Sequence, residues 1–306
     1  MDSQIAHTEV PAQNPAAAMH ALLEKSVDYA GLFPPATLSL KAAGTNYAEY
    51  VSGEHAWMLG RLVLPAERLQ EFAGILASLR GGSGVWLISA LVGQNFGDEL
   101  KLIHNFNRDA GNRACVDSIE FAPGLDRQIG ELLAIVPREC RTYFEVPLDS
   151  TLDLLQTIAQ KGAQAKIRTG GLNPEAIPPF TTVASFIENC VKVKTQFKAT
   201  AGLHHPIRSL HPLTYEPNAV TGEMHGFLNL LVACAFATHG APATVLAQIL
   251  AESDPASFRF TDSHAQWKRE SIPLSVIRQM REELFTSFGS CSFQEPVEDL
   301  TALGWL

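Results

Sequence analysis

Three things are scarce in this 306-residue sequence: cysteine, basic charge and long apolar runs. The five cysteines include no Cys-x-x-Cys pair, and their odd number and wide spacing argue against a disulfide framework or a zinc ribbon. Lys and Arg total 23 against 32 Asp and Glu, which gives a net charge of −9 without a basic block. Because nucleic-acid binding needs concentrated positive charge, we expect no nucleic-acid partner.

The longest apolar stretch, residues 224–237, is interrupted by His225 and Asn229 and is too short to cross a bilayer. Residues 1–18 have neither the basic start nor the apolar centre of an export signal. We therefore expect a soluble, cytoplasmic protein that does not associate with a membrane.

What the sequence does contain is an alternation of short apolar runs and longer amphipathic segments, which is typical of parallel βαβ units. Helical periodicity is clear at residues 66–79, 151–161 and 182–192. Eight runs read as strands: 27–32, 57–64, 85–92, 116–121, 142–146, 165–169, 196–200 and 222–228. This count predicts an α/β protein with a (β/α)8 TIM barrel fold.

The predicted barrel accounts for residues 1–252, including a short N-terminal arm. Residues 253–306 remain, with a helical stretch near 274–285 and many aromatic residues, which argue against disorder. We expect this segment to be a C-terminal helical extension that packs on the barrel or on a second subunit. A homodimer is the expected assembly.

Two of the predicted strands carry one lysine each, Lys166 and Lys198. A buried ammonium group loses hydration and must find a partner or lose its proton. Two lysines that face each other in a barrel would depress each other's pKa, and a lysine with a low pKa forms a Schiff base with a carbonyl compound. The alternative is that both lysines lie at strand edges and reach water.

Active sites of such barrels lie at the carboxyl ends of the strands. Strand alternation places Arg168 on the same face as Lys166, and Thr200 on the same face as Lys198. Asp117 and Glu120 have opposite parity, so only one of them can point into the barrel. The other ionisable candidates at these ends are Asp28, Glu145, His204, His205 and His225. Together they predict an anion-attracting pocket with carboxylates that can move protons.

Five segments in the same order resemble strands of the deoxyribose-phosphate aldolase family. Residues 27–37 (VDYAGLFPPAT) are similar to its opening strand, and Val116-Asp117-Ser118-Ile119 to its fourth strand. Tyr143-Phe144-Glu145 is similar to its fifth strand. Residues 162–170 (GAQAKIRTG) resemble the sixth-strand run with the Schiff-base lysine, and residues 197–202 (FKATAG) the seventh-strand run. The resemblance covers roughly residues 27–205.

The resemblance implies a class I aldolase that needs neither metal nor other cofactor, because the protonated imine is the electron sink. Lys166 would form the imine with a small carbonyl substrate, and Lys198 would hold the pKa of Lys166 down. Asp117, together with Asp28, would organise a water molecule or a proton relay. The substrate-binding residues would be Arg168, Glu145, Glu120, Thr200, His204, His205 and His225.

The sequence also departs from the family. Phe33 stands where the family usually has a lysine, and Arg168 replaces a small hydroxyl residue and adds an anion binder. Residues 203–206 (LHHP) and 224–227 (MHGF) stand where the family has a glycine- and serine-bearing phosphate site. These departures argue against a sugar phosphate as substrate and favour a carboxylate or an unphosphorylated carbonyl compound.

Two alternatives stay open. His204, His205 and His225 with Glu145 would supply ligands for a metal-dependent barrel enzyme, although no His-x-His or His-Glu-x-x-His spacing is present. A barrel without catalytic activity would instead bind a small anion reversibly.

Ser290-Cys291-Ser292 has the composition of a nucleophile setting. We predict neither a strand-turn-helix context nor a nearby base for it, and we assign it no role.

Overall fold

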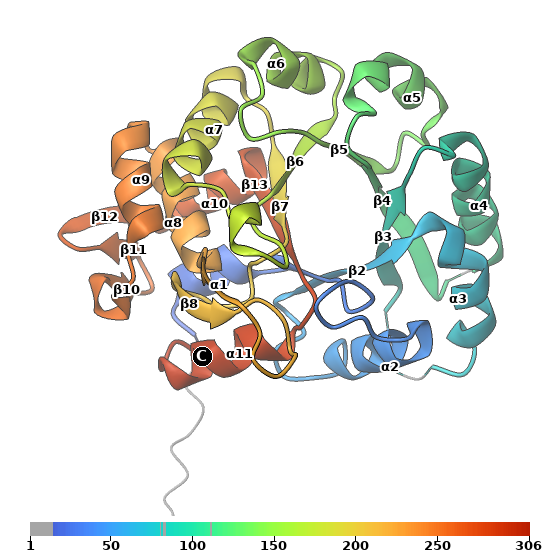
Figure 1. Cartoon of the computed structure of the whole chain (residues 1–306), viewed down its shortest axis with the longest axis horizontal. Coiled ribbons are helices and arrows are strands. Elements are labelled where there is room, and N and C mark those ends of the chain that lie inside the picture. Colours follow the sequence, from blue (N-terminus) through green and yellow to red (C-terminus); the bar gives the residue numbers. More distant parts are fainter. Residues whose placement is uncertain (1–14, 80, 82–83, 111) are drawn as a thin grey trace, which may run out of the picture.

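The computed structural model describes residues 15–79, 81, 84–110 and 112–306. Eight parallel strands close into a barrel, and the helices surround it (Figure 1). Around the barrel the order is β1 (Val27–Tyr29), β13 (Phe285–Ser290), β7 (Phe197–Thr200), β6 (Gln164–Arg168), β5 (Arg141–Glu145), β4 (Ala114–Phe121), β3 (Trp86–Val92) and β2 (Leu59–Pro65). The predicted (β/α)8 fold is confirmed.

Most helices are amphipathic segments that bury one face against the barrel, whereas α8 is buried on all sides. Ser39 and Thr151 cap α2 and α6, because their hydroxyl oxygens accept the N–H groups of Ala42 and Leu154. The helices are α1 (Ala17–Leu23), α2 (Leu40–Tyr50), α3 (Leu69–Leu76), α4 (Phe96–Asp109), α5 (Ile129–Ile135), α6 (Leu152–Gln160), α7 (Phe180–Val193), α8 (Phe227–Thr238), α9 (Ala243–Ala251), α10 (Leu274–Glu283) and α11 (Gln294–Ala302).

The first seven predicted strands form barrel strands whose ends lie within three residues of the expected ones. The eighth prediction, residues 222–228, is wrong. Its first residues belong to β9 (Thr221–Met224), which pairs antiparallel with β8 (Ser209–Pro212) in a two-stranded sheet. Its last two residues begin α8, which is buried along nearly its whole length. A continuous apolar run is compatible with a buried helix as well as with a buried strand, so the apolar pattern alone does not distinguish the two.

The strand that completes the barrel is β13, which lies between β1 and β7. Its pairing with β7 steps from Phe285–Phe197 to Phe288–Ala199, so β13 contains one extra residue. This bulge lets Thr286 and Ser287 both face polar groups inside the barrel while Phe285 and Phe288 pack outside. Such a strand lacks regular alternation, which is why its sequence gave no strand signal.

The predicted boundary at residue 252 is therefore wrong as well. Residues 253–306 hold the closing strand, and they are not an extension outside the barrel. Around that strand the same segment adds α10, α11 and a three-stranded antiparallel sheet of β10 (Phe258–Phe260), β11 (His264–Trp267) and β12 (Glu270–Pro273).

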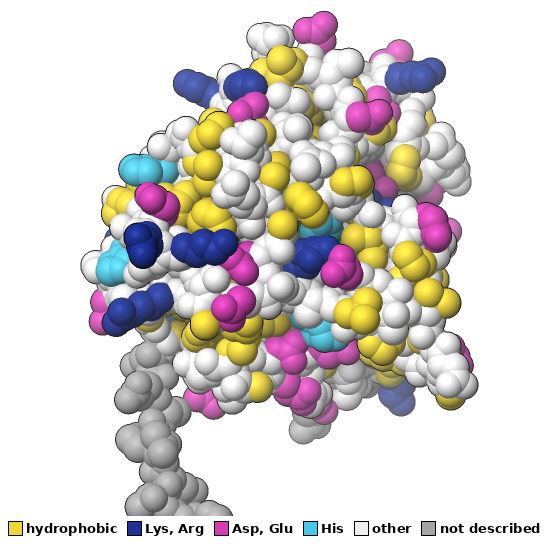
Figure 2. Space-filling model, turned by 60° about the vertical axis from the view of Figure 1, so that its left-hand side comes forward, with side chains coloured by type: hydrophobic (Ala, Val, Ile, Leu, Met, Phe, Trp, Pro, Cys, Tyr) yellow, Lys and Arg dark blue, Asp and Glu magenta, His cyan; other side chains and the backbone are white. Residues whose placement is uncertain are grey.

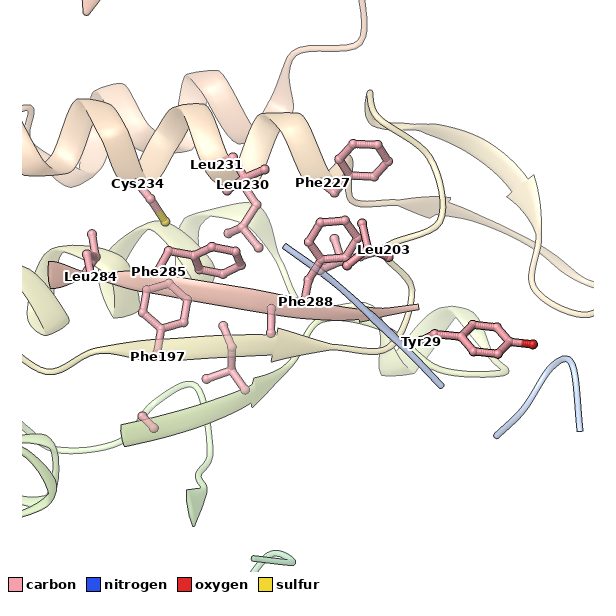
Figure 3. Packing of buried hydrophobic residues seen from close by; sticks show 14 of the residues in the cluster. Tyr29, Phe197, Leu203, Phe227, Leu230, Leu231, Cys234, Leu284, Phe285 and Phe288 are labelled. Atoms are coloured by element: carbon pink, nitrogen blue, oxygen red, sulfur yellow. The ribbon is translucent and has the colours of Figure 1, made fainter. Parts of the chain in front are cut away.

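An aromatic layer fixes β13 to its helices. Figure 3 shows phenylalanines of β7 and β13 beneath α8. The rings of Phe227 and Phe288 stack with centroids 5.0 Å apart, and Phe285 meets Phe197 edge-on at 5.1 Å. This packing holds the polar inner face of β13 in position toward the barrel axis.

On the face in Figure 2, basic and acidic side chains are interspersed with apolar ones. Among the described residues, no helix has the length and apolarity needed to cross a membrane.

Candidate functional site

The barrel interior contains a buried column of charged side chains. Strand register places Glu145, Lys166 and Lys198 side by side on β5, β6 and β7. Asp28 on β1 and Glu120 on β4 complete the column from the other side. The Lys166 and Lys198 side chains are 5 % and 2 % exposed, so the alternative that both lysines reach bulk water is wrong.

Both lysines converge on one carboxylate. Lys198 Nζ donates to Glu120 Oε1 at 2.7 Å, and Lys166 Nζ lies 2.9 Å from Glu120 Oε2. Each lysine also has a carboxylate of its own: Asp28 Oδ2 lies 2.5 Å from Lys198 Nζ, and Glu145 Oε2 lies 3.0 Å from Lys166 Nζ. The result is an alternating chain of anions and cations across the barrel.

Hydroxyl groups donate to the same carboxylate oxygens that contact Lys198. Ser89 donates to Glu120 Oε1 at 2.6 Å, and Ser287 donates to Asp28 Oδ2 at 2.6 Å. The other oxygen of Asp28 accepts the Arg61 backbone N–H at 2.8 Å. These groups hold the carboxylates in place, as buried charges require. Sequence reasoning missed the two serines because small polar residues in strands give no signal of their own.

The two lysines do not face each other directly, because Glu120 lies between them. Burial by itself would lower the pKa of Lys198, but the charges of Asp28 and Glu120 outweigh burial and raise it. The expectation that the lysines depress each other's pKa is therefore wrong for Lys198. Burial would raise the pKa of Glu120, yet Lys166 and Lys198 hold it well below its usual range.

Exposure increases across the column from Lys198 to Glu145, which lie at one level of the barrel, and is largest at Arg168, the last residue of β6. Lys198 is 2 % exposed, Lys166 5 %, Glu145 10 % and Arg168 56 %. Arg168 Nε lies 3.4 Å from Glu145 Oε1, which is a long contact, so its other guanidinium N–H groups point to solvent at the rim. Lys166 is thus the lysine on the same strand as Arg168, two residues before it.

Asp117 does not belong to this column. Its two oxygens accept Arg61 Nε and Nη2, both at 2.7 Å, and its side chain is 26 % exposed. The pairing of β4 with β3 steps from Val116 to Ser118, so Asp117 is an extra residue in β4. The predicted role of Asp117 beside the lysines is wrong, and Glu120 takes that place.

Arg61 lines a cavity of about 1280 Å³ at the amino ends of the strands, opposite Arg168. Other lining residues stand near strand starts: Lys25, Leu59, Trp86, Arg141 and Thr286.

The three candidate histidines go to separate partners. His204 Nδ1 contacts Glu295 Oε2 at 3.0 Å, and His205 Nδ1 contacts Asp299 Oδ2 at 2.6 Å. His225 Nε2 donates to the carbonyl oxygen of Pro178 at 2.8 Å. Within the described part of the chain, no group of three His, Cys, Asp or Glu side chains is placed to hold a metal ion.

Thr200 stands at the carboxyl end of β7, where its side chain faces Gly289 of β13. A Cβ at Gly289 would lie 3.0 Å from Thr200 Oγ1, so the strands approach closely there. Of the predicted residues, the structure brings together Asp28, Glu120, Glu145, Lys166, Arg168 and Lys198.

No protein-family model and no curated protein matches this sequence. Among solved structures, FabK from Thermotoga maritima is 13 % identical with a TM-score of 0.36, and the match covers 63 % of this chain and 56 % of FabK. A mutant of that FabK gives 14 % identity, a TM-score of 0.38 and coverage of 63 % and 60 %. The chain thus spans about 60 % of the FabK length. Apo-MsnO8 is 10 % identical with a TM-score of 0.40 over 93 % of this chain and 97 % of its own. At this level of similarity, neither protein indicates a reaction or a ligand for this chain.

Proposed function

We propose that this barrel is a carbon–carbon lyase of the class I aldolase type, which binds a small carbonyl compound as an imine on Lys166. The observation that carries the proposal is the convergence of Lys166 and Lys198 on the two oxygens of Glu120, inside the barrel. Two buried lysines with shared carboxylates supply both a nucleophile and the groups that move its protons.

Lys166 is the better nucleophile of the two by position. Lys198 is enclosed between Asp28 and Glu120, and its raised pKa keeps it an ammonium ion. Lys166 is next to Glu145, the most exposed of the three carboxylates in the column and the one that also contacts Arg168. A carbonyl compound that enters past Arg168 therefore meets Lys166 first.

The charge of the column suits an iminium ion. Asp28, Glu120 and Glu145 give three negative charges against two on the lysines. An ammonium ion and a carbonyl compound give an iminium ion and water, so the positive charge beside the carboxylates is conserved. Glu145, at 3.0 Å from Lys166 Nζ, takes the proton that the amine must lose before attack and returns it when water leaves.

Bond cleavage then follows from the iminium ion. The bond between the α- and β-carbons breaks, its electrons move to the iminium nitrogen to give an enamine, and the β-hydroxyl proton passes to Glu145. The β-carbon leaves as an aldehyde. Protonation of the enamine carbon restores the iminium ion, and water releases the second carbonyl product and the lysine.

Arg168 gives the site its preference for anions. Its guanidinium group is 56 % exposed and presents N–H donors at the rim in the fork geometry that suits carboxylate and phosphate. We therefore expect a small carbonyl substrate that carries a carboxylate or phosphate.

Trapping of the imine tests this proposal. Sodium borohydride with acetaldehyde or pyruvate should leave an irreversible adduct on Lys166, located by peptide mass spectrometry. K166M should abolish the adduct, whereas K192M, which changes an exposed lysine, should retain it. The absence of an adduct across aldehydes and ketones between about pH 7 and 9, or an undiminished adduct in K166M, would remove the proposal.

Reversible anion binding without catalysis is the second candidate, since Arg168 is exposed and Lys198 stays charged. It predicts that pyruvate binds reversibly in a titration, that R168Q lowers the affinity for pyruvate, and that borohydride traps no adduct.

A further inference from the structure

A second group of reactive side chains lies at the carboxyl ends of β7 and β13, apart from the lysine column. Cys291 directly follows β13, and α11 begins three residues later at Gln294. The expectation that this cysteine lacks a strand-turn-helix context is therefore wrong. The expected absence of a base is wrong too, because His204, four residues after β7, contacts the sulfur.

The contacts resemble a nucleophile–base–carboxylate relay. Cys291 Sγ lies 3.8 Å from Nδ1 and 3.9 Å from Nε2 of His204. His204 Nδ1 is 3.0 Å from Glu295 Oε2, which leaves Nε2 for the thiol proton. The Glu295 backbone N–H donates to Ser292 Oγ at 3.1 Å, which holds the start of α11 against the residue that follows Cys291.

Tyr215 lies over this group. Its hydroxyl donates to Glu295 Oε1 at 2.9 Å and is 3.7 Å from Cys291 Sγ. Cys291 is 5 % exposed, but Tyr215 is 58 % exposed, so the sulfur lies beside a side chain at the surface. The phenol hydroxyl beside the sulfur is a donor that a molecule bound there would meet.

The surroundings of the sulfur differ from those of the other cysteines. Burial raises the pKa of Cys115, Cys140, Cys190 and Cys234, as in structural thiols. Cys291 instead contacts an imidazole. Burial would lower the pKa of His204, but hydrogen bonds with Cys291 and Glu295 outweigh burial and raise it to about 9. The other titratable groups that face this cluster are Tyr29, Tyr215, His205, Asp299 and His211.

We propose that Cys291 is a nucleophile that accepts an acyl group from a small ester or thioester, with His204 as proton carrier and Glu295 as the residue that orients His204. The sulfur forms a bond to the carbonyl carbon, and the bond from that carbon to the alcohol or thiol leaving group breaks. The thiol proton passes through His204 Nε2 to the leaving group. Water then hydrolyses the new thioester, which releases the carboxylic acid and restores the thiol.

Acetylation by p-nitrophenyl acetate tests the proposal on the full chain at pH 9. Peptide mass spectrometry should find Cys291 acetylated at least tenfold faster than Cys115, the half-buried thiol that serves as internal control. H204N should slow acetylation of Cys291 by about 100-fold, the usual contribution of general base catalysis, and should leave Cys115 unchanged.

The comparison of the two thiols needs no variant, so a folding defect in H204N does not obscure it. Equal acetylation rates at Cys291 and Cys115, or an unchanged Cys291 rate in a folded H204N protein, would overturn the proposal. Failure of the lysine-trapping experiment has no bearing on this result, because the two sites share no residue.

Discussion

Removal of Lys198 tests the buried column most directly. K198M keeps an unbranched apolar stem but removes the ammonium ion between Asp28 and Glu120. Asp28 keeps the Ser287 hydroxyl and the Arg61 N–H, and Glu120 keeps Ser89 and Lys166. Two buried carboxylates nevertheless lose their shared counter-ion.

The expected cost follows from burial. The Lys198, Asp28 and Glu120 side chains are 2 %, 0 % and 3 % exposed, so water cannot replace the lost charge. Removing one partner of such a pair costs about 3–5 kcal/mol, and the remaining hydrogen bonds place K198M near the lower value, about 3 kcal/mol.

The loss should also depend on pH. The lowered pKa of Glu120 contributes stability that is present above its unfolded value near 4.5 and is lost as pH falls through the folded value. We expect K198M to raise the pKa of Glu120 in the folded protein, and each pKa unit corresponds to about 1.4 kcal/mol of unfolding free energy. Protonation of Glu120 in acid therefore destabilises K198M less than it destabilises the wild type. The difference in unfolding free energy between wild type and K198M should be constant from about pH 6 to 9 and should shrink below about pH 5.

Urea unfolding followed by tryptophan fluorescence at several pH values measures this difference. K192M is the matched control, because Lys192 pairs with Glu188 on the surface at 54 % and 30 % exposure. Solvent screening limits the control to about 0.5 kcal/mol or less. If K198M is no less stable than K192M at pH 7, or if its deficit grows in acid, the reasoning about the column is refuted.

Two further predictions concern the proposed sites. R168Q should raise the pyruvate concentration needed for half-maximal borohydride trapping about tenfold, which is equivalent to about 1.4 kcal/mol of binding free energy. The acetaldehyde concentration for half-maximal trapping should not change. Equal effects on pyruvate and acetaldehyde would contradict an anion-binding role of Arg168. The rate of Cys291 acetylation should rise with pH and show an inflection at about 9, because His204 must be neutral to accept a proton. E295Q should move this inflection toward the ordinary imidazole pKa near 6.5. An inflection that E295Q leaves in place would show that His204 is not the titrating group.

The sequence by itself determined much of the barrel. The alternation of apolar runs and amphipathic segments gave seven of the eight strands, because the period of two in strands and 3.6 in helices is visible locally. It also put Lys166 and Lys198 on neighbouring strands, and the β6–β7 register of the structure pairs them directly. The aldolase resemblance and the imine stay predictions.

Tertiary structure decided what surrounds those lysines. The bulge at Asp117 sends that carboxylate to Arg61, and Glu120 meets both lysines instead. The closing strand β13 comes from residues 285–290, whose bulge and small polar residues hide its strand character. A bulge adds one residue to a strand, so the side chains after it point to the opposite face from the one that simple alternation predicts. Inward and outward positions predicted from the sequence are therefore wrong beyond a bulge.

The contact between Cys291 and His204 joins residues 87 positions apart. Periodicity reports only neighbours along the chain, whereas closure of the barrel brings the ends of β7 and β13 together. The aromatic layer is buried and the last strand edges are paired only in the complete barrel. Closure of the barrel therefore determines which strand ends meet and which side chains can exchange a proton.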